Sequence, residues 1–340
     1  MKHLVESTYM ETIELSLSDI RKLTLDILIT HGCDTKNASS ISHIITDAER
    51  DGCESHGLFR LPGYIASLQS GKANGRAEPK LMNKSPVIIE VDGQRGFAPI
   101  AHEVGLPRLV SAAKTFGVAV LSLRHILHFA ALWPETEYLA RNDLVGMACT
   151  SYLPKVAPHG TKSALFGTNP ISFAWPRKDN HPVCFDMATS STALGNVQIA
   201  AREGKLVDEG IGLNKLGEHT RDPAEIIQGM LLPFGGYKGS AFSLMVELLS
   251  AGLTGDFFGF ESEGQNHDDG GPALGGEFVV AYSPSMIAGE GWPEHAESFI
   301  RRYQSLDGAY LPGKRRYAKR RDEGTRQINK PLYDTIMALN

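Results

Sequence analysis

The sequence predicts a mixed α/β (α+β) protein built around one large mixed sheet. Apolar residues recur with a helical period through the first fifty residues, and after Pro86 strand patterns alternate with helix patterns. The chain has 340 residues, of which 42% are hydrophobic and 21% are charged. This composition can bury a sizeable core in one large domain or two intertwined domains.

Two helices are predicted in the first fifty residues. Ser18 is positioned to cap the first helix, and Gly32 marks its end. The second helix places the apolar residues of 41–48 at helical spacing and ends at Gly52.

From Val87 onward, the pattern predicts strands and helices in alternation. The predicted strands cover residues 87–91, 118–123, 145–149, 171–174, 182–185 and 277–282, and the predicted helices cover 98–116 and 238–253. Residues 259–276 are polar and rich in glycine, so we predict a mobile surface loop there that could act as a lid.

The charge balance argues against nucleic-acid and membrane partners. The formal net charge is -5, which gives no general attraction to polyanions. The basic run at 314–321 is interpreted as a solvated helix face or a local phosphate contact. A nucleic-acid-binding tail is the alternative interpretation of that run.

The sequence also indicates a cytoplasmic protein without a metal. Its four cysteines form no C-x-x-C pair, so they are interpreted as reduced thiols. Residues 1–11 lack the apolar core of a signal peptide, and no run of about 18 apolar residues occurs, so secretion and membrane insertion are not expected. Residues 267–269, HDD, resemble metal ligands, but no second ligand cluster follows at a fixed spacing.

The segment at 51–64, DGCESHGLFRLPGY, carries the clearest chemical signal. If the turn from Ser55 is helical, His56 and Arg60 share one face, because residues four apart are neighbours on a helix. A proton donor beside a guanidinium that binds a carboxylate is suited to reducing a C=O or C=N bond next to a carboxylate. The simpler alternative is two ordinary polar residues at the surface.

Common nucleotide-binding and hydrolase motifs do not occur in the sequence. The glycines at 210 and 212 lack the third glycine of the dinucleotide fingerprint, which disfavours a Rossmann domain. Residues 235–240, GGYKGS, are not a P-loop, but their glycines, Lys238 and the following helix can bind a phosphate. A serine hydrolase is disfavoured because no G-x-S-x-G elbow occurs and the adjacent side chains of Ser55 and His56 diverge.

Five segments, taken together and in order, resemble one enzyme family. They are SHGLFRLPGY at 55–64, LFGTNP at 165–170, FDMATS at 185–190, PFGGYKGS at 233–240 and LPG at 311–313. The set resembles the malate/L-lactate (sulfolactate) dehydrogenase-like family, which uses NAD(P)H without a Rossmann fold. HFAALWP at 128–134 and NVQIAAREG at 196–204 are most similar to the family's Δ1-piperideine-2-carboxylate/Δ1-pyrroline-2-carboxylate reductases, which reduce cyclic imino acids to L-pipecolate or L-proline.

The resemblance implies a role for each matching residue of the substrate site. His56 is the proton donor, and Ser55 and Asp186 orient and polarise it. Arg60 pairs with the substrate carboxylate, and Thr168 contacts the substrate. A carboxylate at Asp186 is expected to favour the protonated form of His56.

The resemblance also implies NADPH as the cofactor, with NADH as a weaker possibility. The expected cofactor contacts are His128, Phe129, Ala130, Ala131, Leu132, Asp186, Met187, Ala188, Thr189, Lys238, Gly313, Lys314 and Arg315. Among them, Lys314 and Arg315 supply positive charge for the 2′-phosphate.

The implied organisation has three parts. Residues 1–123 form a helical substrate and dimerisation region, and residues 124–300 form a non-Rossmann NAD(P)H-binding domain with a mostly antiparallel sheet. Residues 301–340 pack back on the N-terminal region and contribute cofactor contacts. The expected partners are a small-molecule substrate and a second copy of the chain in a homodimer.

NADPH-dependent reduction of a cyclic imino acid is therefore the predicted function. The rival within the family is a 2-oxoacid dehydrogenase of the malate or lactate type. A dicarboxylic substrate needs a second cation in the pocket, whereas residues 129–133 offer an apolar surface. A nucleic-acid-binding protein and a ligand-binding module without catalysis are the alternatives from other classes.

Overall fold

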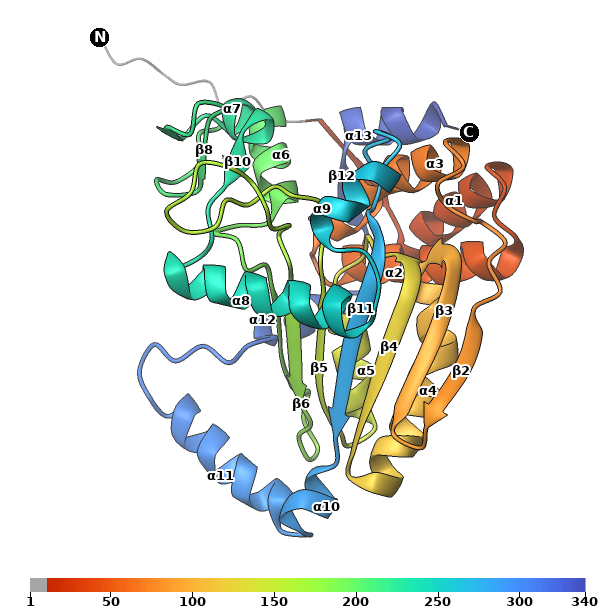
Figure 1. Cartoon of the computed structure of the whole chain (residues 1–340), viewed down its shortest axis with the longest axis vertical. Helices are drawn as coiled ribbons and strands as arrows, with labels where there is room; N and C mark the ends of the chain where they lie inside the picture. The colour runs from red at the N-terminus through yellow and green to blue at the C-terminus, as the bar shows by residue number, and fades with distance from the viewer. Residues whose placement is uncertain (1–10, 340) are drawn as a thin grey trace.

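A seven-stranded mixed sheet forms the centre of the protein, seen here as a computed structural model that describes residues 11–339 (Figure 1). The strands lie in the order β2-β3-β4-β11-β5-β6-β7. Their bounds are β2 (Lys80–Ser85), β3 (Ile88–Phe97), β4 (Val118–Leu127), β5 (Val145–Thr150), β6 (Ile171–Trp175), β7 (Val183–Met187) and β11 (Leu274–Tyr282). In this sheet β3 and β4 run parallel, and the other neighbouring pairs are antiparallel. The predicted mixed α/β class with a large mixed sheet is confirmed.

Helices cover both faces of the sheet. α4 (Ala98–Phe116) makes the crossover that parallel β3 and β4 require, and it lies with α5 (Trp133–Arg141) behind the sheet in Figure 1. α8 (Tyr237–Glu247) crosses the opposite face. The predicted helix at 238–253 is one element in sequence but changes to π-helical turns over Leu248–Leu253.

The N-terminal helices pack at one end of the sheet. They are α1 (Leu17–Thr30), α2 (Thr35–Arg50) and α3 (Leu61–Gln69). The predicted cap at Ser18 is wrong, because the side chain of Ser16 accepts the N–H of Asp19 and completes a capping box. A hydrophobic core of buried Ile, Leu, Tyr and Phe side chains joins these helices to the ends of β4 and β11.

The two ends of the described chain pair with each other. β1 (Thr12–Leu15) runs antiparallel to β12 (Arg326–Asn329), and α13 (Lys330–Met337) follows β12 against α3. The C-terminal segment therefore lies against the N-terminal helices. The predicted boundary between residues 123 and 124 falls inside β4, so β2, β3 and most of β4 belong to the same sheet as the later strands.

The chain between β7 and α8 in sequence forms a smaller unit. It contains α6 (Leu194–Arg202), α7 (Pro223–Gln228) and a three-stranded sheet of β8 (Gly212–Leu213), β9 (His219–Thr220) and β10 (Met230–Leu231). The remaining helices are α9 (Gly259–Ser262), α10 (Pro284–Ala288), α11 (Trp292–Gln304) and α12 (Lys314–Arg320). Among residues 11–339, no helix combines the length and apolar character needed to cross a membrane.

The segment at 259–276 is more ordered than predicted. It begins with α9 and a short 3₁₀ turn over Glu263–Gln265, and its end belongs to β11. Lys72, whose side chain is fully buried, donates to Asp269 Oδ1 at 2.6 Å and fixes the connecting loop. Part of the predicted loop is therefore regular structure, and a buried ion pair at Asp269 anchors the connection between α9 and β11. Residues 1–10, which entered the signal-peptide argument, lie outside the described residues.

Candidate active site

The predicted motif forms a tight loop at the end of α2. Two 3₁₀ turns, Glu54–His56 and Leu58–Arg60, follow each other and are separated by Gly57, so the continuous helical turn expected from Ser55 does not form. The buried carboxylate of Glu49 accepts the backbone N–H of Leu58 at 2.7 Å. It also occupies the space that a Cβ at Gly57 would need.

A cavity of about 810 Å³ opens beside this loop and collects most of the predicted site. Eleven of the predicted residues line it: Ser55, His56, Arg60, His128, Phe129, Ala130, Thr168, Asp186, Met187, Ala188 and Arg315. Gly313 lines an adjoining cavity of about 380 Å³, whose wall also includes Asp186 and Arg315. Segments from distant parts of the sequence thus meet at one site.

Five predicted cofactor contacts do not line either cavity. Three of the five are buried in the protein interior: Ala131, Leu132 and Thr189. Residues next to them in the sequence line the cavity in their place. The Thr189 hydroxyl donates to Asn169 O at 2.9 Å, which turns it inward. Lys238 and Lys314 are exposed, so their side chains extend into solvent away from the cavity walls.

Arg60 is a half-buried cation without a carboxylate partner among the described residues. Its guanidinium carbon lies 4.5 Å from the ring centroid of Phe129 and 5.4 Å from that of Phe59. Burial lowers the pKa of Arg60, and its Nε has no hydrogen-bond partner. An unpaired guanidinium in a cavity is a receptor for an anion, and a carboxylate matches its planar fork.

His56 lies beside Arg60 as a neutral imidazole. Its Nδ1 is 3.0 Å from Ser55 Oγ, as expected for a serine that orients the ring. Burial, followed by the charges of Arg60 and His128, lowers the pKa of His56 from 6.5 to about 3. The expectation that the protonated form is favoured is therefore wrong for the protein alone.

Asp186 lines the cavity but makes different contacts from those expected. Its carboxylate accepts the backbone N–H of Leu132 at 2.7 Å and of Trp133 at 3.1 Å, and burial raises its pKa to about 6. In the described chain these contacts, rather than one with His56, account for its position. Asp186 thus fixes the start of α5 at the cavity wall.

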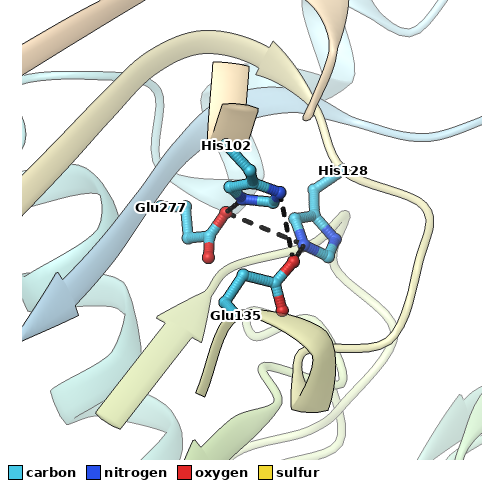
Figure 2. A group of neighbouring side chains, drawn as sticks. All are labelled: His102, His128, Glu135 and Glu277. Carbon is cyan, nitrogen blue, oxygen red and sulfur yellow. Dashed lines mark hydrogen bonds and ion pairs between the residues drawn. The ribbon is translucent and has the colours of Figure 1, made fainter. Parts of the chain in front are cut away.

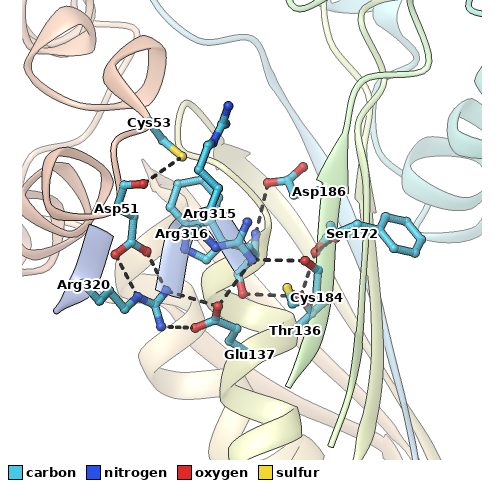
Figure 3. Close-up of polar contacts among 12 residues, drawn as sticks. Asp51, Cys53, Thr136, Glu137, Ser172, Cys184, Asp186, Arg315, Arg316 and Arg320 are labelled. Atoms are coloured by element: carbon cyan, nitrogen blue, oxygen red, sulfur yellow. Dashed lines mark hydrogen bonds and ion pairs between the residues drawn. The ribbon is translucent and has the colours of Figure 1, made fainter. Parts of the chain in front are cut away.

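The basic run at the C-terminal end divides between the cavity and the protein interior (Figure 3). Arg320 bridges Asp51 and Glu137, with Nε 2.8 Å from Asp51 Oδ1 and Nη1 2.7 Å from Glu137 Oε2. Arg316 lies 4.9 Å above the ring of Trp133. Arg315 and Arg316 both line the two cavities, and Arg315 is the one of the three arginines that makes no ion pair among the described residues. The interpretation of the whole run as a solvated face is wrong, because two of its arginines are paired internally.

Sequence reasoning missed three residues that shape the site. Tyr152 lines the cavity, and its hydroxyl donates to Gly271 O at 3.1 Å. Gly195, at the start of α6, is so close that an added Cβ would lie 3.1 Å from Ser55 Cβ and 3.3 Å from Arg60 Nη2. Glu49 supports the loop from behind. None of the three belongs to a spacing motif, although the helical pattern of α2 places Glu49 on its inward face.

Comparison with known proteins agrees with the resemblance in sequence. The family model described as malate/L-lactate dehydrogenase matches residues 15–337. A Δ1-pyrroline-2-carboxylate/Δ1-piperideine-2-carboxylate reductase from Pseudomonas putida is 40% identical over 309 residues, which covers 91% of each chain. The corresponding protein of Pseudomonas syringae pv. tomato is 41% identical over 310 residues, covering 91% of this chain and 90% of that protein.

Solved structures share the fold along nearly the whole chain. The crystal structure of Δ1-piperideine-2-carboxylate reductase from Pseudomonas syringae pv. tomato superposes with a TM-score of 0.91 at 39% identity, covering 97% of this chain and all of that one, 100%. Sulfolactate dehydrogenase from Methanocaldococcus jannaschii superposes with a TM-score of 0.86 at 28% identity, covering 96% of each chain.

Proposed function

The chain belongs to the malate/L-lactate dehydrogenase family of oxidoreductases, and from this premise we propose that it reduces the C=N bond of a cyclic imino acid with NADPH. The proposed substrates are Δ1-pyrroline-2-carboxylate and Δ1-piperideine-2-carboxylate, and the products are L-proline and L-pipecolate. The observation that carries this proposal is the unpaired guanidinium of Arg60 beside a neutral His56. The similarity to reductases of that name supports it.

Arg60 would hold the substrate through its carboxylate. A bidentate pair fixes the plane of the carboxylate, and in a cyclic imino acid that plane sets the position of the adjacent C=N bond. Phe129, which stacks against Arg60, would present an apolar surface to the ring methylenes. Thr168, which also lines the cavity, would contact the substrate as well.

His56 would accept a hydrogen bond from the substrate nitrogen. A cyclic imine is basic enough to arrive protonated, so its N–H needs an acceptor, and a neutral imidazole supplies one. A nicotinamide cofactor supplies the hydride to C2 when it is bound. Reduction of a 2-oxoacid instead requires a proton donor for the new hydroxyl. Burial lowers the pKa of His56 in the protein without substrate, which suits an acceptor better than a donor.

The residues around the two cavities fit a dinucleotide. The cavities share Asp186, Arg315 and Arg316, so they adjoin along a wall that carries two cations. The Nε of Arg316 is buried without a hydrogen-bond partner, as expected for a donor that serves a bound group. Arg315 would bind the 2′-phosphate of NADPH, which supports the preference over NADH. The binding region would be non-Rossmann, since the sheet beside it is largely antiparallel.

A homodimer in the cytoplasm completes the proposal. An apolar cavity of about 1040 Å³ lies between the sheet and α11, and side chains of α10 and α11 extend it at the surface. Ile287 is 63% exposed and Phe299 is 72% exposed, and such a patch is typical of an interface. We place the contact with a second copy there, in addition to the N-terminal helices. The four free cysteines support a reducing compartment.

A parallel assay tests the function. NADPH oxidation is measured with both cyclic imino acids, pyruvate, oxaloacetate and diketogulonate. We expect kcat/KM for a cyclic imino acid to exceed that for any open-chain 2-oxoacid by at least about tenfold, because Phe129 beside Arg60 presents an apolar surface that suits the ring methylenes. Equal or faster turnover of pyruvate or oxaloacetate would establish the 2-oxoacid dehydrogenase instead.

A further inference from the structure

Four buried side chains from four different elements converge behind the cavity wall (Figure 2). His102 lies on α4, His128 follows β4, Glu135 lies in the first turn of α5, and Glu277 lies on β11. Each is less than a tenth exposed. One ligand atom from each of the four lies within 4.8 Å of the other three.

The imidazole of His102 lies between the two carboxylates. Its Nδ1 is 3.1 Å from Glu135 Oε1, and its Nε2 is 2.7 Å from Glu277 Oε2. The Nε2 of His128 points at the same two carboxylates, at 3.8 Å and 3.7 Å. Figure 2 shows the two rings on one side of the group and the carboxylates closing it.

The Nε2 of His128 faces the centre of this group and has no hydrogen-bond partner, although it is buried. The oxygens that face the two histidines are Glu135 Oε1 and Glu277 Oε2, and the second oxygen of each carboxylate is buried without a partner as well. Buried polar atoms are normally paired, so the unpaired nitrogen between two carboxylates points to a missing partner there. Two buried carboxylates also need two positive charges in a region that excludes water.

We propose that His102, His128, Glu135 and Glu277 bind a divalent transition-metal ion, with zinc as the best fit. Two imidazole nitrogens and two carboxylate oxygens form a four-membered set of the borderline kind that zinc prefers. A divalent ion balances the two carboxylates without further charge. Ligands of a tetrahedral zinc at about 2.0–2.2 Å lie roughly 3.3–3.6 Å apart, so atoms that now lie up to 4.8 Å apart must approach by about 1.5 Å at most.

Magnesium fits the set poorly, because it prefers oxygen ligands in an octahedron and retains water. The burial of all four side chains leaves little room for such water.

The metal would hold the cavity wall in place and takes part in no step of the reaction. It would tie α4, α5 and β11 to His128, whose ring lines the cavity beside His56. Loss of the metal should therefore loosen the wall. This proposal does not depend on the identity of the substrate.

Tag-free full-length protein tests the proposal through metal binding and stability. After dialysis against a chelator, we expect one zinc ion per chain to bind on titration, measured by elemental analysis and calorimetry. Zinc at about 100 times its Kd should raise the midpoint of thermal unfolding by roughly 5 °C. Magnesium at the same concentration should not. Cobalt(II) should give the strong visible bands of a four-coordinate site in the unmutated chain, which needs no variant to fold.

Matched variants locate the site. Glu277→Gln and Glu135→Gln keep the side-chain shape, and each should weaken zinc binding more than about 100-fold, beyond the usual cost of losing an outer-shell partner. Glu90→Gln is the control, because Glu90 is a buried glutamate of β3 that pairs with Lys84 and Arg124 outside the cluster. Absence of zinc and cobalt binding by the unmutated chain would overturn the proposal. Unchanged zinc affinity in both cluster variants would overturn it equally.

Discussion

The carboxylate of Glu49 accepts the backbone N–H of Leu58 at 2.7 Å and fixes the loop that carries His56 and Arg60. Burial is the main cause that raises the pKa of Glu49 to about 7, and the hydrogen bond from Leu58 opposes it. Glu49 therefore supports the site through its shape and its acceptor atom, and its negative charge is a cost.

This relationship predicts opposite effects for two substitutions of Glu49. Its folded-state pKa lies above the unfolded value, so its contribution to stability is lost as pH rises from 4.5 to about 7. Glu49→Gln keeps the acceptor and removes the charge, and at pH 8 it should raise the free energy of unfolding by on the order of 1–3 kcal/mol. Glu49→Ala should lower it by about 1–3 kcal/mol, because Leu58 N–H loses its partner. Denaturant unfolding at pH 5 and pH 8 measures both; a Glu49→Gln variant that is less stable at pH 8 would contradict the argument.

Arg60→Lys should cost on the order of 10² in kcat/KM, because an ammonium lacks the planar fork that orients a carboxylate. The loss should shrink for a cyclic imine without the carboxylate. Arg202→Lys is the matched control, since Arg202 stacks on Phe59 at 4.7 Å but does not line the cavity. Steady-state kinetics with the cyclic imino acid and with the cyclic imine that lacks the carboxylate measures both losses. If the two variants behave alike, Arg60 is not the substrate clamp.

Much of the fold could be predicted because its elements have strong periodic patterns. The predicted helix at 98–116 matches α4 residue for residue, since its apolar face is continuous and its ends are marked. Strand ends were harder to predict: β4 extends to Leu127 and β11 begins at Leu274 because neighbouring strands continue the ladder. Such pairing depends on segments far away in the sequence.

The site was predictable only where one short motif carries it. The segment at 51–64 brought His56 and Arg60 to the cavity although it folds as two 3₁₀ turns. Asp186 reached the cavity, but the backbone of α5 determines its hydrogen bonds. The group around His102 could not be predicted, because its members come from four elements with no fixed spacing.

Arg315→Ala should raise the KM for NADPH by about tenfold or more and leave that for NADH nearly unchanged, because a guanidinium pairs strongly with a phosphate. Lys314→Ala removes the same charge one residue away, from a side chain that lines neither cavity. It should change both constants much less. Cofactor titrations at saturating imino acid measure the difference. A uniform effect of Arg315→Ala on both cofactors would remove the 2′-phosphate role.

Gly195→Ala should raise the KM for the imino acid between about 10- and 100-fold, because the new methyl group displaces Ser55 and Arg60 from their positions. Gly264→Ala is the control, since a Cβ at Gly264 meets nothing within 4 Å. Thermal unfolding measured alongside the kinetics separates a local shift from general instability. A KM that stays at the unmutated value would show that α6 does not restrict the clamp.

His56→Ala should lower kcat/KM by about 10- to 100-fold through lost positioning, without changing the pH profile. Burial is the largest cause of its low pKa and persists when a substrate carboxylate offsets the charge of Arg60. The kcat profile of the unmutated enzyme should therefore show no limb near 6.5, the ordinary pKa of histidine.

The pH dependence of the free energy of unfolding tests the low pKa of His56 independently of the kinetics. Because the folded pKa lies below the unfolded one, the contribution of His56 to stability is lost as pH falls from 6.5 toward 3. The decrease in unfolding free energy between pH 7.5 and pH 5 should be smaller in His56→Gln. A limb near 6.5 that disappears in His56→Ala would instead make His56 a general acid and favour the 2-oxoacid reaction.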